Sequence, residues 1–495
     1  MTQPILPTIE HNRAAMDEAL HRDINPDMHV RHFRTYGRKA SLYYVEGIAS
    51  VDFLQHYVLT PLTLLRDETP VKPLADAVHA AVYNCDVQSA LTIEEAVTHM
   101  MNGRAVVFVD GMDSALGFDV RMFVRRSISP PLTESVVLGP HQGFNESIRD
   151  SITLLRRILP SPQLIGEMRT IGNTYPTALS VMYLDGAVDA DCLERLKNRL
   201  DGIHTDQVLS IGALQQLIED RPFSLIPQCI LTERPDRAAS MLLEGQIVLV
   251  LDGSPQVLVL PGSILHLLHT PDDTSARWQY GTFLRIIRLI GLFSALLLPG
   301  LFVAFVTFHP EALPVTLLTA VLESQSAVPL SIPAETLLML LMFNLVGEAS
   351  TRAPSLAGST LGTVSGLILG QAAVEAKLIH PLLIIVVAVA SLGSYAVPDY
   401  SLGLAVRIGQ LLMLAAGCVF GVYGMVLFMA AGTVRLCALT SLGTPFAAPI
   451  APQRAHNPDL LSRWPLWHQR WRTWLGSSRQ QRVQGPMRRW DRRNR

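Results

Sequence analysis

The sequence predicts tandem α/β subdomains followed by a multi-span membrane α-helical domain and a basic tail. Charge is dense as far as residue 275, whereas residues 286–432 hold long apolar runs with few ionised groups. Sequence patterns recur within the charged half, and residues 454–495 carry eleven arginines against two aspartates, a net charge of +9. Such a split is typical of a soluble domain joined to a membrane domain. The expected division is an extension at 1–30, a first α/β subdomain with its connecting helix at 31–158, a second at 159–275, a transmembrane domain at 284–434 and a basic cytoplasmic tail at 435–495.

An internal repeat organises the soluble half. The stretch YVEGIASVDFL starts at Tyr44 and YLDGAVDADCL at Tyr183; later in each copy, GRAVVFVDGMDSAL starts at Gly103 and GQIVLVLDGSPQVL at Gly245. The acid-Gly pair and the later Asp-Gly pair are 64 residues apart in the first copy and 67 in the second. We infer a duplicated α/β subdomain, in which a buried strand, an acid-Gly turn, a helix and a hairpin follow one another.

Four acidic residues stand beside glycine at matching positions of the two copies. Their carboxylates fit either a metal or catalytic cluster or ordinary turns. Because Asp and Gly recur at turns for backbone reasons, the turn interpretation is favoured. The four residues are Glu46, Asp110, Asp185 and Asp252.

The remaining motifs predict a protein that is not an enzyme and has no metal or cofactor. No nucleophile elbow, kinase signature, HExxH or Walker motif occurs in the sequence. The five cysteines lie far apart without a CxxC spacing, so reduced thiols are expected. The segment TERPDRAA, which starts at Thr232, groups charges around a proline and is interpreted as a salt-bridged connector rather than a catalytic site.

Five apolar segments are candidate membrane spans. Only the first, fourth and fifth reach the roughly 20 residues that a bilayer core requires. The second is bounded by Glu335 and Glu348 and contains Asn344. We therefore expect four spans, with a half-helix or interfacial segment buried by protein at the second position. The candidates are 286–308, 336–347, 358–374, 378–397 and 408–432.

Basic residues on both sides of the apolar half predict its orientation. Arg277, Arg285 and Arg288 lie before or at the start of the first span and the arginine-rich tail follows the last, which places both ends in the cytoplasm. The N-terminal sequence also lacks an apolar core of signal-peptide length. An even number of crossings then puts the 309–333 connection outside and Lys377 on the cytoplasmic side.

Glycines at every fourth position form a stripe on the third candidate span. Such a stripe lets another helix backbone approach closely, either within the chain or between subunits around a pore. Gln371 and Glu375 follow the stripe and are candidate pore-lining residues near the cytoplasmic mouth. Glu348 and Arg352 are spaced for an ion pair at the membrane boundary, with a gating charge as the alternative. The glycines are Gly358, Gly362, Gly366 and Gly370.

Tryptophans and arginines alternate in the tail. The tryptophans fall at spacings of three, four and three, on one face of a helix, and arginines flank them. We expect this helix to lie on anionic membrane lipids and not to bind nucleic acid, although Arg-Trp alternation suits either partner. The residues are Trp464, Trp467, Trp471 and Trp474, with Arg463, Arg470, Arg472 and Arg479.

A series of short segments runs in order along most of the chain, from about residue 30 to about residue 470. The most specific are TERPD, FHPE, which starts at Phe308, and GQAAVEA, which starts at Gly370. With them come EGI, PPLTESVVLGPHQGFNES, GEASTRAPSLAGSTLG and VPDYS. In this order they resemble the GerA family of spore germination proteins. Lys377 and His380 depart from the family pattern, in which smaller or apolar residues follow VEA.

The resemblance implies a function that the residues alone do not give. It implies an A-type subunit of a nutrient germinant receptor in the inner spore membrane, or the sporulation-stage paralogue of the same family. Such subunits work with B-type and C-type subunits and are thought to form homo-oligomers that conduct ions. The alternative is a non-conducting membrane scaffold that holds partner germination proteins. No ligand-binding residue is assigned.

Overall fold

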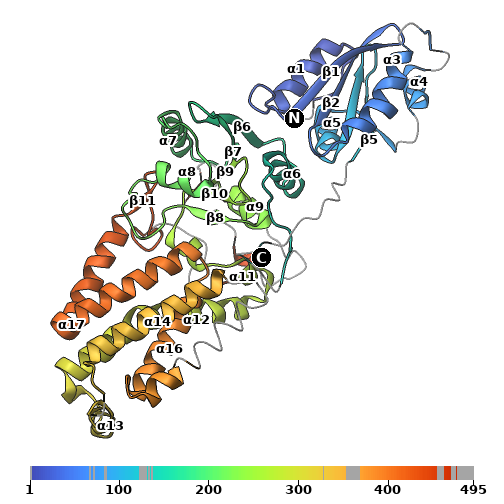
Figure 1. Ribbon diagram of the computed structural model, residues 1–495. Coiled ribbons are helices and arrows are strands. Elements are labelled where there is room, and N and C mark those ends of the chain that lie inside the picture. The colour runs from blue at the N-terminus through green and yellow to red at the C-terminus, as the bar shows by residue number, and fades with distance from the viewer. Residues whose placement is uncertain are drawn as a thin grey trace.

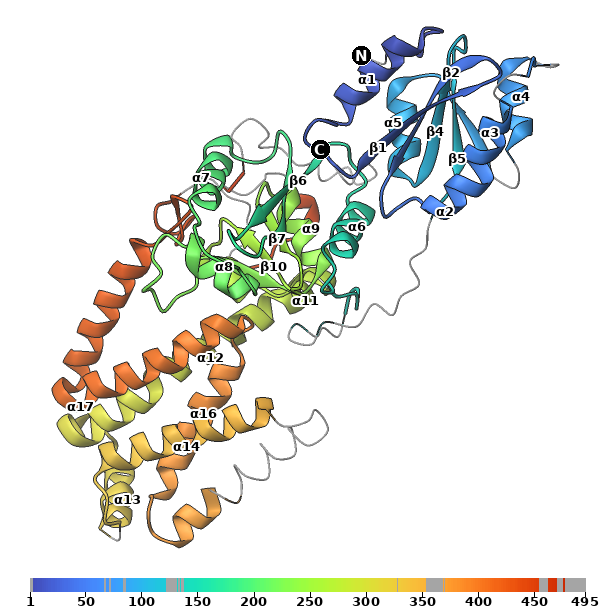
Figure 2. The same cartoon turned by 45° about the horizontal axis from the view of Figure 1, so that its top comes forward.

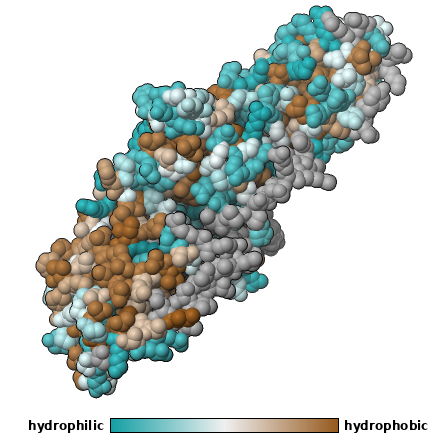
Figure 3. Space-filling view, viewed as in Figure 1, coloured by the Kyte–Doolittle hydropathy of each residue, from teal (hydrophilic) through white to brown (hydrophobic). Residues whose placement is uncertain are grey.

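The computed structural model shows an elongated protein in which three parts follow one another (Figures 1 and 2). Two α/β subdomains are followed by a helical domain, and hydrophobic residues gather over the helical domain on the face shown in Figure 3. This architecture confirms the predicted fold class. The structure describes residues 3–65, 68–70, 73–82, 86–121, 131, 134, 138–326, 328–352, 368, 370–453, 462–469 and 475–476, without the side chains of 351 and 352.

The first subdomain is an antiparallel five-stranded sheet with helices on both faces. Its strand order is β1-β2-β4-β5-β3. One face packs on α1 and α5, and the other packs on α2, α3 and α4, so the apolar side chains of the central strand β4 are buried alternately in two cores. The strands are β1 Met28–Thr35, β2 Arg38–Val45, β3 Val87–Ala90, β4 Arg104–Val109 and β5 Ala115–Asp119; the helices are α1 Ile9–Ala19, α2 Val51–Phe53, the π-helix Leu54–Leu59, α3 Thr60–Leu64, α4 Leu74–Ala81 and α5 Ile93–Met101.

The second subdomain repeats this topology. Its order, β6-β7-β9-β10-β8, matches the first strand by strand. The register is also the same, because Ala40 pairs with Val109 in the first sheet and Leu179 with Leu251 in the second. The predicted duplication is confirmed. The strands are β6 Leu164–Ile171, β7 Thr177–Leu184, β8 Ile230–Thr232, β9 Ile247–Leu251 and β10 Val257–Leu260; the helices are α6 Ile148–Ile158, α7 Ala190–Asp201, α8 Ile211–Ile218 and α9 Pro235–Leu243.

The acid-Gly pairs are turns, as predicted. The four glycines that follow the acids have φ between 75° and 87°, a backbone conformation that favours glycine. Two of the carboxylates also cap helices: Asp110 accepts a hydrogen bond from the Ile9 backbone N–H, and Asp252 accepts one from the Ile148 backbone N–H, each at 3.2 Å. The glycines are Gly47, Gly111, Gly186 and Gly253.

These caps also show which helix belongs to which subdomain. Helix α1 holds the same place in the first copy as α6 holds in the second, and α6 packs against α9, β7 and β9. The sequence had assigned α1 to an extension and α6 to the first subdomain, because a helix leading into a repeat cannot be told from one leaving it. The buried Arg156 of α6 reaches back to the first copy, where its guanidinium group pairs with Asp27 and donates to the Asn25 side chain at 3.3 Å.

The helical domain contains three helices with the length and apolar composition of membrane spans, among the residues that the structure describes. One of them, α14, includes residues 336–347, where the sequence predicted only a half-helix. Helix α14 is longer because Glu335 in its first turn is buried and hydrogen-bonded, so the helix continues past it. The second subdomain ends in α10 Ile264–Leu268 and α11 Pro271–Ser275. The helices of the helical domain are α12 Trp278–Phe308, the 3-10 turn Pro310–Ala312, α13 Val315–Gln325, α14 Ile332–Arg352, α16 Pro381–Tyr395 and α17 Tyr400–Cys437.

Two of the expected spans have different bounds in the structure. The segment 378–397 forms only the 15-residue α16, which starts at Pro381 and ends before Pro398. The expected span 408–432 lies within α17, which Gly421 interrupts with φ 59° and ψ −145°. A side chain added at Gly424 would lie 3.3 Å from the carbonyl carbon of Ala416, although residues eight apart in a straight helix are separated by about 12 Å. Helix α17 therefore folds back on itself, as Figures 1 and 2 show.

Candidate functional site

The glycine stripe that the sequence singled out lies largely outside the described residues. This holds for Gly358, Gly362 and Gly366, and for the side chain of Arg352, so the ion pair with Glu348 stays a prediction. Gly370 is buried, and a side chain added there would approach Ile384 at 3.9 Å. Gln371 and Glu375 are exposed.

The segment that carries Gln371 and Glu375 lies at the end of the helical domain remote from the α/β subdomains. The core at this end contains Ala373 and Ile379 together with Val321 of α13, and the His380 ring stacks on Phe302 near the end of α12. Gln371, Glu375 and Lys377 therefore lie at the same end as the 309–333 connection, whereas the sequence had placed the two segments on opposite sides of the membrane. The parity argument failed because it counted 336–347 as a half-helix and α17 as one straight span.

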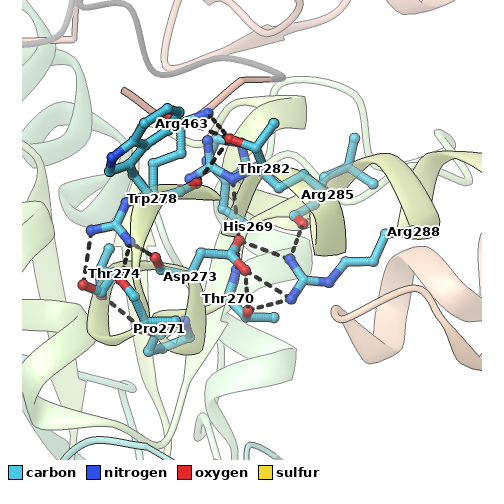
Figure 4. Close-up of polar contacts among 12 residues, drawn as sticks. His269, Thr270, Pro271, Asp273, Thr274, Trp278, Thr282, Arg285, Arg288 and Arg463 are labelled. Carbon is cyan, nitrogen blue, oxygen red and sulfur yellow. Dashed lines mark hydrogen bonds and ion pairs between the residues drawn. The ribbon is translucent and has the colours of Figure 1, made fainter. Parts of the chain in front are cut away.

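A buried aspartate joins the second subdomain to the first long membrane helix. Asp273 lies in α11, wholly buried, and its carboxylate closes a capping box with Thr270. The Arg288 guanidinium of α12 donates to both carboxylate oxygens at 2.8 and 2.9 Å, and Arg285 donates at 3.2 Å (Figure 4). Because Arg285 and Arg288 are three residues apart on one helix face, one carboxylate serves both.

The pKa of Asp273 shows that the carboxylate is held as an anion. Burial raises this pKa, but hydrogen bonds and charge from Arg288 and the charge of Arg285 outweigh burial and keep the pKa below its ordinary value. From the sequence, Arg285 and Arg288 were used only as charges that flank the first span. In the structure both pair with Asp273; Arg285 is buried and Arg288 is nearly buried. This site was not predicted from the sequence, although the capping pattern TPDD and the spacing of Arg285 and Arg288 could have pointed to it.

Arg463 of the C-terminal tail also binds at the Asp273 site. This side chain is 3 % exposed, and its guanidinium group donates to the backbone carbonyls of Asp273, Ala276 and Thr274, the last two at 2.8 Å. Its backbone N–H donates to the Thr282 hydroxyl at 3.0 Å (Figure 4). The sequence had placed Arg463 beside a lipid-bound amphipathic helix, but the described part of that segment forms only the 3-10 turn Leu466–His468.

Arg463→Ala is expected to release the tail from α11. Hydrogen bonds from a charged donor contribute roughly 1.5–3 kcal/mol, and the substitution leaves three carbonyls without this donor. Limited proteolysis of the full chain should therefore cleave the tail faster than in the unmodified protein. Arg435→Ala, at an exposed arginine near the end of α17, is the control and should leave the rate unchanged; equal rates for both variants would contradict the docking role.

A second contact joins the other end of the helical domain to the same subdomain. After α17 the chain forms the hairpin β11 Thr440–Ser441 and β12 Thr444–Pro445. The Asp220 carboxylate accepts hydrogen bonds from the backbone N–H groups of Leu442 and Gly443 at 3.0 and 3.1 Å, from the Thr440 hydroxyl, and from Arg199 at 2.6 Å. One side chain of the second subdomain thus holds the whole hairpin.

The residues on either side of this hairpin extend the contact. The Gly262 backbone N–H donates to the Ser441 hydroxyl at 2.9 Å, and the Ile264 backbone N–H donates to the Phe446 carbonyl at 3.1 Å. The Phe446 side chain is wholly buried in the core of the second subdomain. The helical domain is therefore clamped to this subdomain where α12 begins and where α17 ends. We call these two contacts, at Asp273 and at Asp220, the double clamp.

Comparison with known proteins shows which family this chain belongs to. The model of the family described as Bacillus/Clostridium GerA spore germination protein matches residues 14–474. The chain belongs to the GerA family. Among its curated relatives, Spore germination protein KA of Bacillus subtilis is 32% identical over 86% of this chain and 78% of that protein. Spore germination protein A1 of the same organism is 34% identical over 78% of this chain and 80% of that protein.

Further comparisons extend the picture of the GerA chain. Stage V sporulation protein AF of Bacillus subtilis is 26% identical over 86% of this chain and 86% of that protein. A crystal structure of the N-terminal domain of the A subunit of the Bacillus megaterium spore germinant receptor GerK3 aligns with 53% of this chain and 97% of that domain, at 24% identity and a TM-score of 0.42. The match to the GerA model spans both subdomains, the helical domain and the tail beyond Arg463.

The TERPD segment of this GerA chain is a connector, as the sequence predicted. Arg234 is wholly buried at the start of α9, pairs with Asp236 at 2.7 Å and donates to the Pro140 carbonyl at 3.1 Å. Arg237 pairs with Glu134 and donates to the His266 carbonyl at 2.8 Å. These contacts fix the segment that enters the second subdomain to the loop that leads into the helical domain.

Acidification is expected to open the Asp220 contact of the GerA chain. Burial raises the pKa of Asp220, but hydrogen bonds from Thr440, Arg199 and Gly443 outweigh it, so the pKa lies below the ordinary value of 3.8. A lowered pKa stabilises docking above that ordinary value, and the stabilisation is lost as pH falls through the lowered pKa. Proteolysis of the β11–β12 hairpin should increase below about pH 4 in the unmodified chain. Asp220→Asn should show fast cleavage at neutral pH and little further change in acid.

Proposed function

We propose that this chain is the A-type subunit of a nutrient germinant receptor in the inner spore membrane, with both termini in the cytoplasm. The observation that carries the proposal is the double clamp, because it fixes both ends of the helical domain to one α/β subdomain. A displacement of that subdomain therefore moves α12 and α17 together. Relatives named as germination proteins, at 31–34% identity, support the receptor role over that of the sporulation-stage relative at 26%.

The partners in this proposal are a B-type subunit, a C-type subunit, further copies of this chain and membrane lipids. Large apolar side chains exposed along the helices support contacts with lipid or with other copies. Nutrient binding would shift the second subdomain, and the helices would open an ion pathway within the oligomer. These side chains include Leu345, Ile385, Leu392, Phe420, Tyr423, Val426 and Leu427.

The receptor role is tested in spores that lack their own nutrient receptors. Spores that express this chain with its B-type and C-type partners should release ions on nutrient addition, and spores with the partners alone should not. Arg463→Ala should delay release, because one of the two clamps is weakened, while Arg435→Ala should not. Release of ions by the two partners without this chain would overturn the proposal.

Ion conduction needs a separate test, since a scaffold would also be required for release. The purified full chain is reconstituted in planar bilayers over a range of protein-to-lipid ratios. Conductance that rises with oligomer content supports the ion pathway. Silent bilayers that contain oligomers support the alternative, a non-conducting scaffold for the partner subunits.

A further inference from the structure

The helical domain buries one ionisable pair that the receptor mechanism above does not use. Glu335 lies in the first turn of α14, and His380 directly precedes α16; both side chains are wholly buried. The His380 Nδ1 lies 2.8 Å from the Glu335 Oε2, and the His380 backbone N–H donates to the same oxygen at 3.2 Å. The pair thus joins two helices at the end of the domain remote from the subdomains.

Each member of the pair has one atom without a hydrogen-bond partner among the described residues. These atoms are Glu335 Oε1 and His380 Nε2. The surroundings are apolar: the imidazole ring stacks on Phe302 at 5.4 Å between centroids, and the neighbouring core contains Val303 and Leu383. A buried charge in such surroundings is stable only when it is compensated.

Charge balance determines what this pair can bind. A carboxylate beside a neutral imidazole carries a net charge of minus one, and one added proton makes the pair electrically neutral. A metal ion requires more ligands than two, and the described part of the chain holds no cluster of three or more His, Cys, Asp or Glu side chains. A proton needs neither further ligands nor a cavity.

We propose that Glu335 and His380 form a buried proton-binding site that fastens α14 to the start of α16. The site holds one proton beyond those of the carboxylate and the neutral imidazole. Release of that proton to water leaves a net negative charge in an apolar core, which weakens the contact between the two helices. No electron is transferred and no covalent bond other than N–H or O–H changes.

The helices that pack around Glu335 and His380 carry other ionisable groups, which lie elsewhere in the domain and leave this pair as its buried proton-binding site. Helices α16 and α17 place Tyr395 and Arg407, in contact with each other, at the opposite end of the domain. The same end carries the partly buried His309 and the exposed Glu311 after α12, the exposed Glu323 of α13, and the exposed Glu375 and Lys377 before α16. Helix α17 adds the partly buried Cys418 and the exposed Tyr423, whose ring contacts His309.

The test compares this pair with an exposed pair of the same chemistry. In the first subdomain, His29 Nε2 lies 2.9 Å from Glu46 Oε2, and these side chains are 40% and 37% exposed. Nitrogen NMR of the full chain in lipid vesicles, with labelled histidine, reports the charge of each imidazole. The His380 signal is assigned by its loss in His380→Gln.

Opposite results are expected for the two pairs. In the unmodified chain the His380 signal should be that of a charged imidazolium, because the buried Glu335 carboxylate compensates its charge. Glu335→Gln removes the negative charge, so the His380 signal should change to that of a neutral imidazole, whereas Glu46→Gln should leave the His29 signal at the same pH nearly unchanged. A His380 imidazole that is neutral in the unmodified chain and unaffected by Glu335→Gln overturns the proposal.

A second measurement covers the case in which Glu335→Gln does not fold. Thermal unfolding of the unmodified chain in vesicles should show a loss of stability as the pH is raised, because release of the proton leaves a buried negative charge. The double variant Glu335→Leu/His380→Leu replaces the pair with apolar side chains of suitable size and should lose this pH dependence while remaining folded. Parallel pH profiles for the two proteins would overturn the proposal.

Discussion

Asp273→Asn is expected to lower the free energy of unfolding by roughly 3–5 kcal/mol, because it removes a wholly buried anion that pairs with Arg285 and Arg288. Both arginines donate to the Asp273 carboxylate, and Arg285 is 4 % exposed. An amide has nearly the same shape, so the loss reports charge and not packing. Thermal or chemical unfolding of the purified full chain, followed by circular dichroism, measures it.

The matched control is an aspartate that lies on the surface. Asp191 is exposed in the first turn of α7, and Asp191→Asn should change stability by less than about 0.5 kcal/mol. Asp273→Asn should also make the tail more accessible to protease, because Arg463 binds the backbone of α11. A variant as stable as the control would show that the carboxylate does not hold the junction.

Gly393→Ala is expected to separate α16 from α12 and to destabilise the helical domain by roughly 1–3 kcal/mol, the usual effect of overpacking. A methyl group at this position would lie 3.1 Å from the Gly291 carbonyl carbon and 3.2 Å from the Ala295 backbone nitrogen. Neither backbone can yield without moving a helix. The change is measured as a lower unfolding midpoint of the full chain in detergent.

Gly403→Ala is the natural control, because no atom lies within 4 Å of a side chain added there. In that variant alanine should stabilise α17, since it favours a helix by about 1 kcal/mol over glycine. Opposite signs for the two substitutions would identify Gly393 as a close helix contact within one chain. If Gly393→Ala also stabilised the protein, α12 and α16 would not be packed backbone to backbone.

The sequence predicted those features that local patterns determine. The duplication was visible because each copy needs a glycine with positive φ at its turns, and the Asp-Gly pairs recur for that reason. The same local pattern did not reveal that Asp110 and Asp252 cap α1 and α6, because each cap joins residues more than 100 positions apart. The subdomain boundary, which depends on those caps, was therefore misplaced.

The junction and the path of the helices depend on contacts that are distant in sequence. Arg463 lies 190 residues after Asp273, and its arginine-rich surroundings favoured a lipid-bound helix. Gly421 stands in an apolar run together with other glycines, and a helix-packing glycine has the same sequence pattern as one that reverses the chain. Only the backbone conformation at that residue distinguishes the two cases.

The reversal at Gly421 has a mechanical consequence for the chain. Because α17 returns to the subdomain from which α12 departs, the polypeptide forms a closed loop whose two ends are anchored on one rigid body. Because the second subdomain holds both ends of this loop, a displacement of that subdomain acts on α12 and α17 together. We therefore expect the helices to tilt together as one unit when the second subdomain moves. Gly421, which packs against Phe308 and His309, lies at the end of the loop farthest from its anchors.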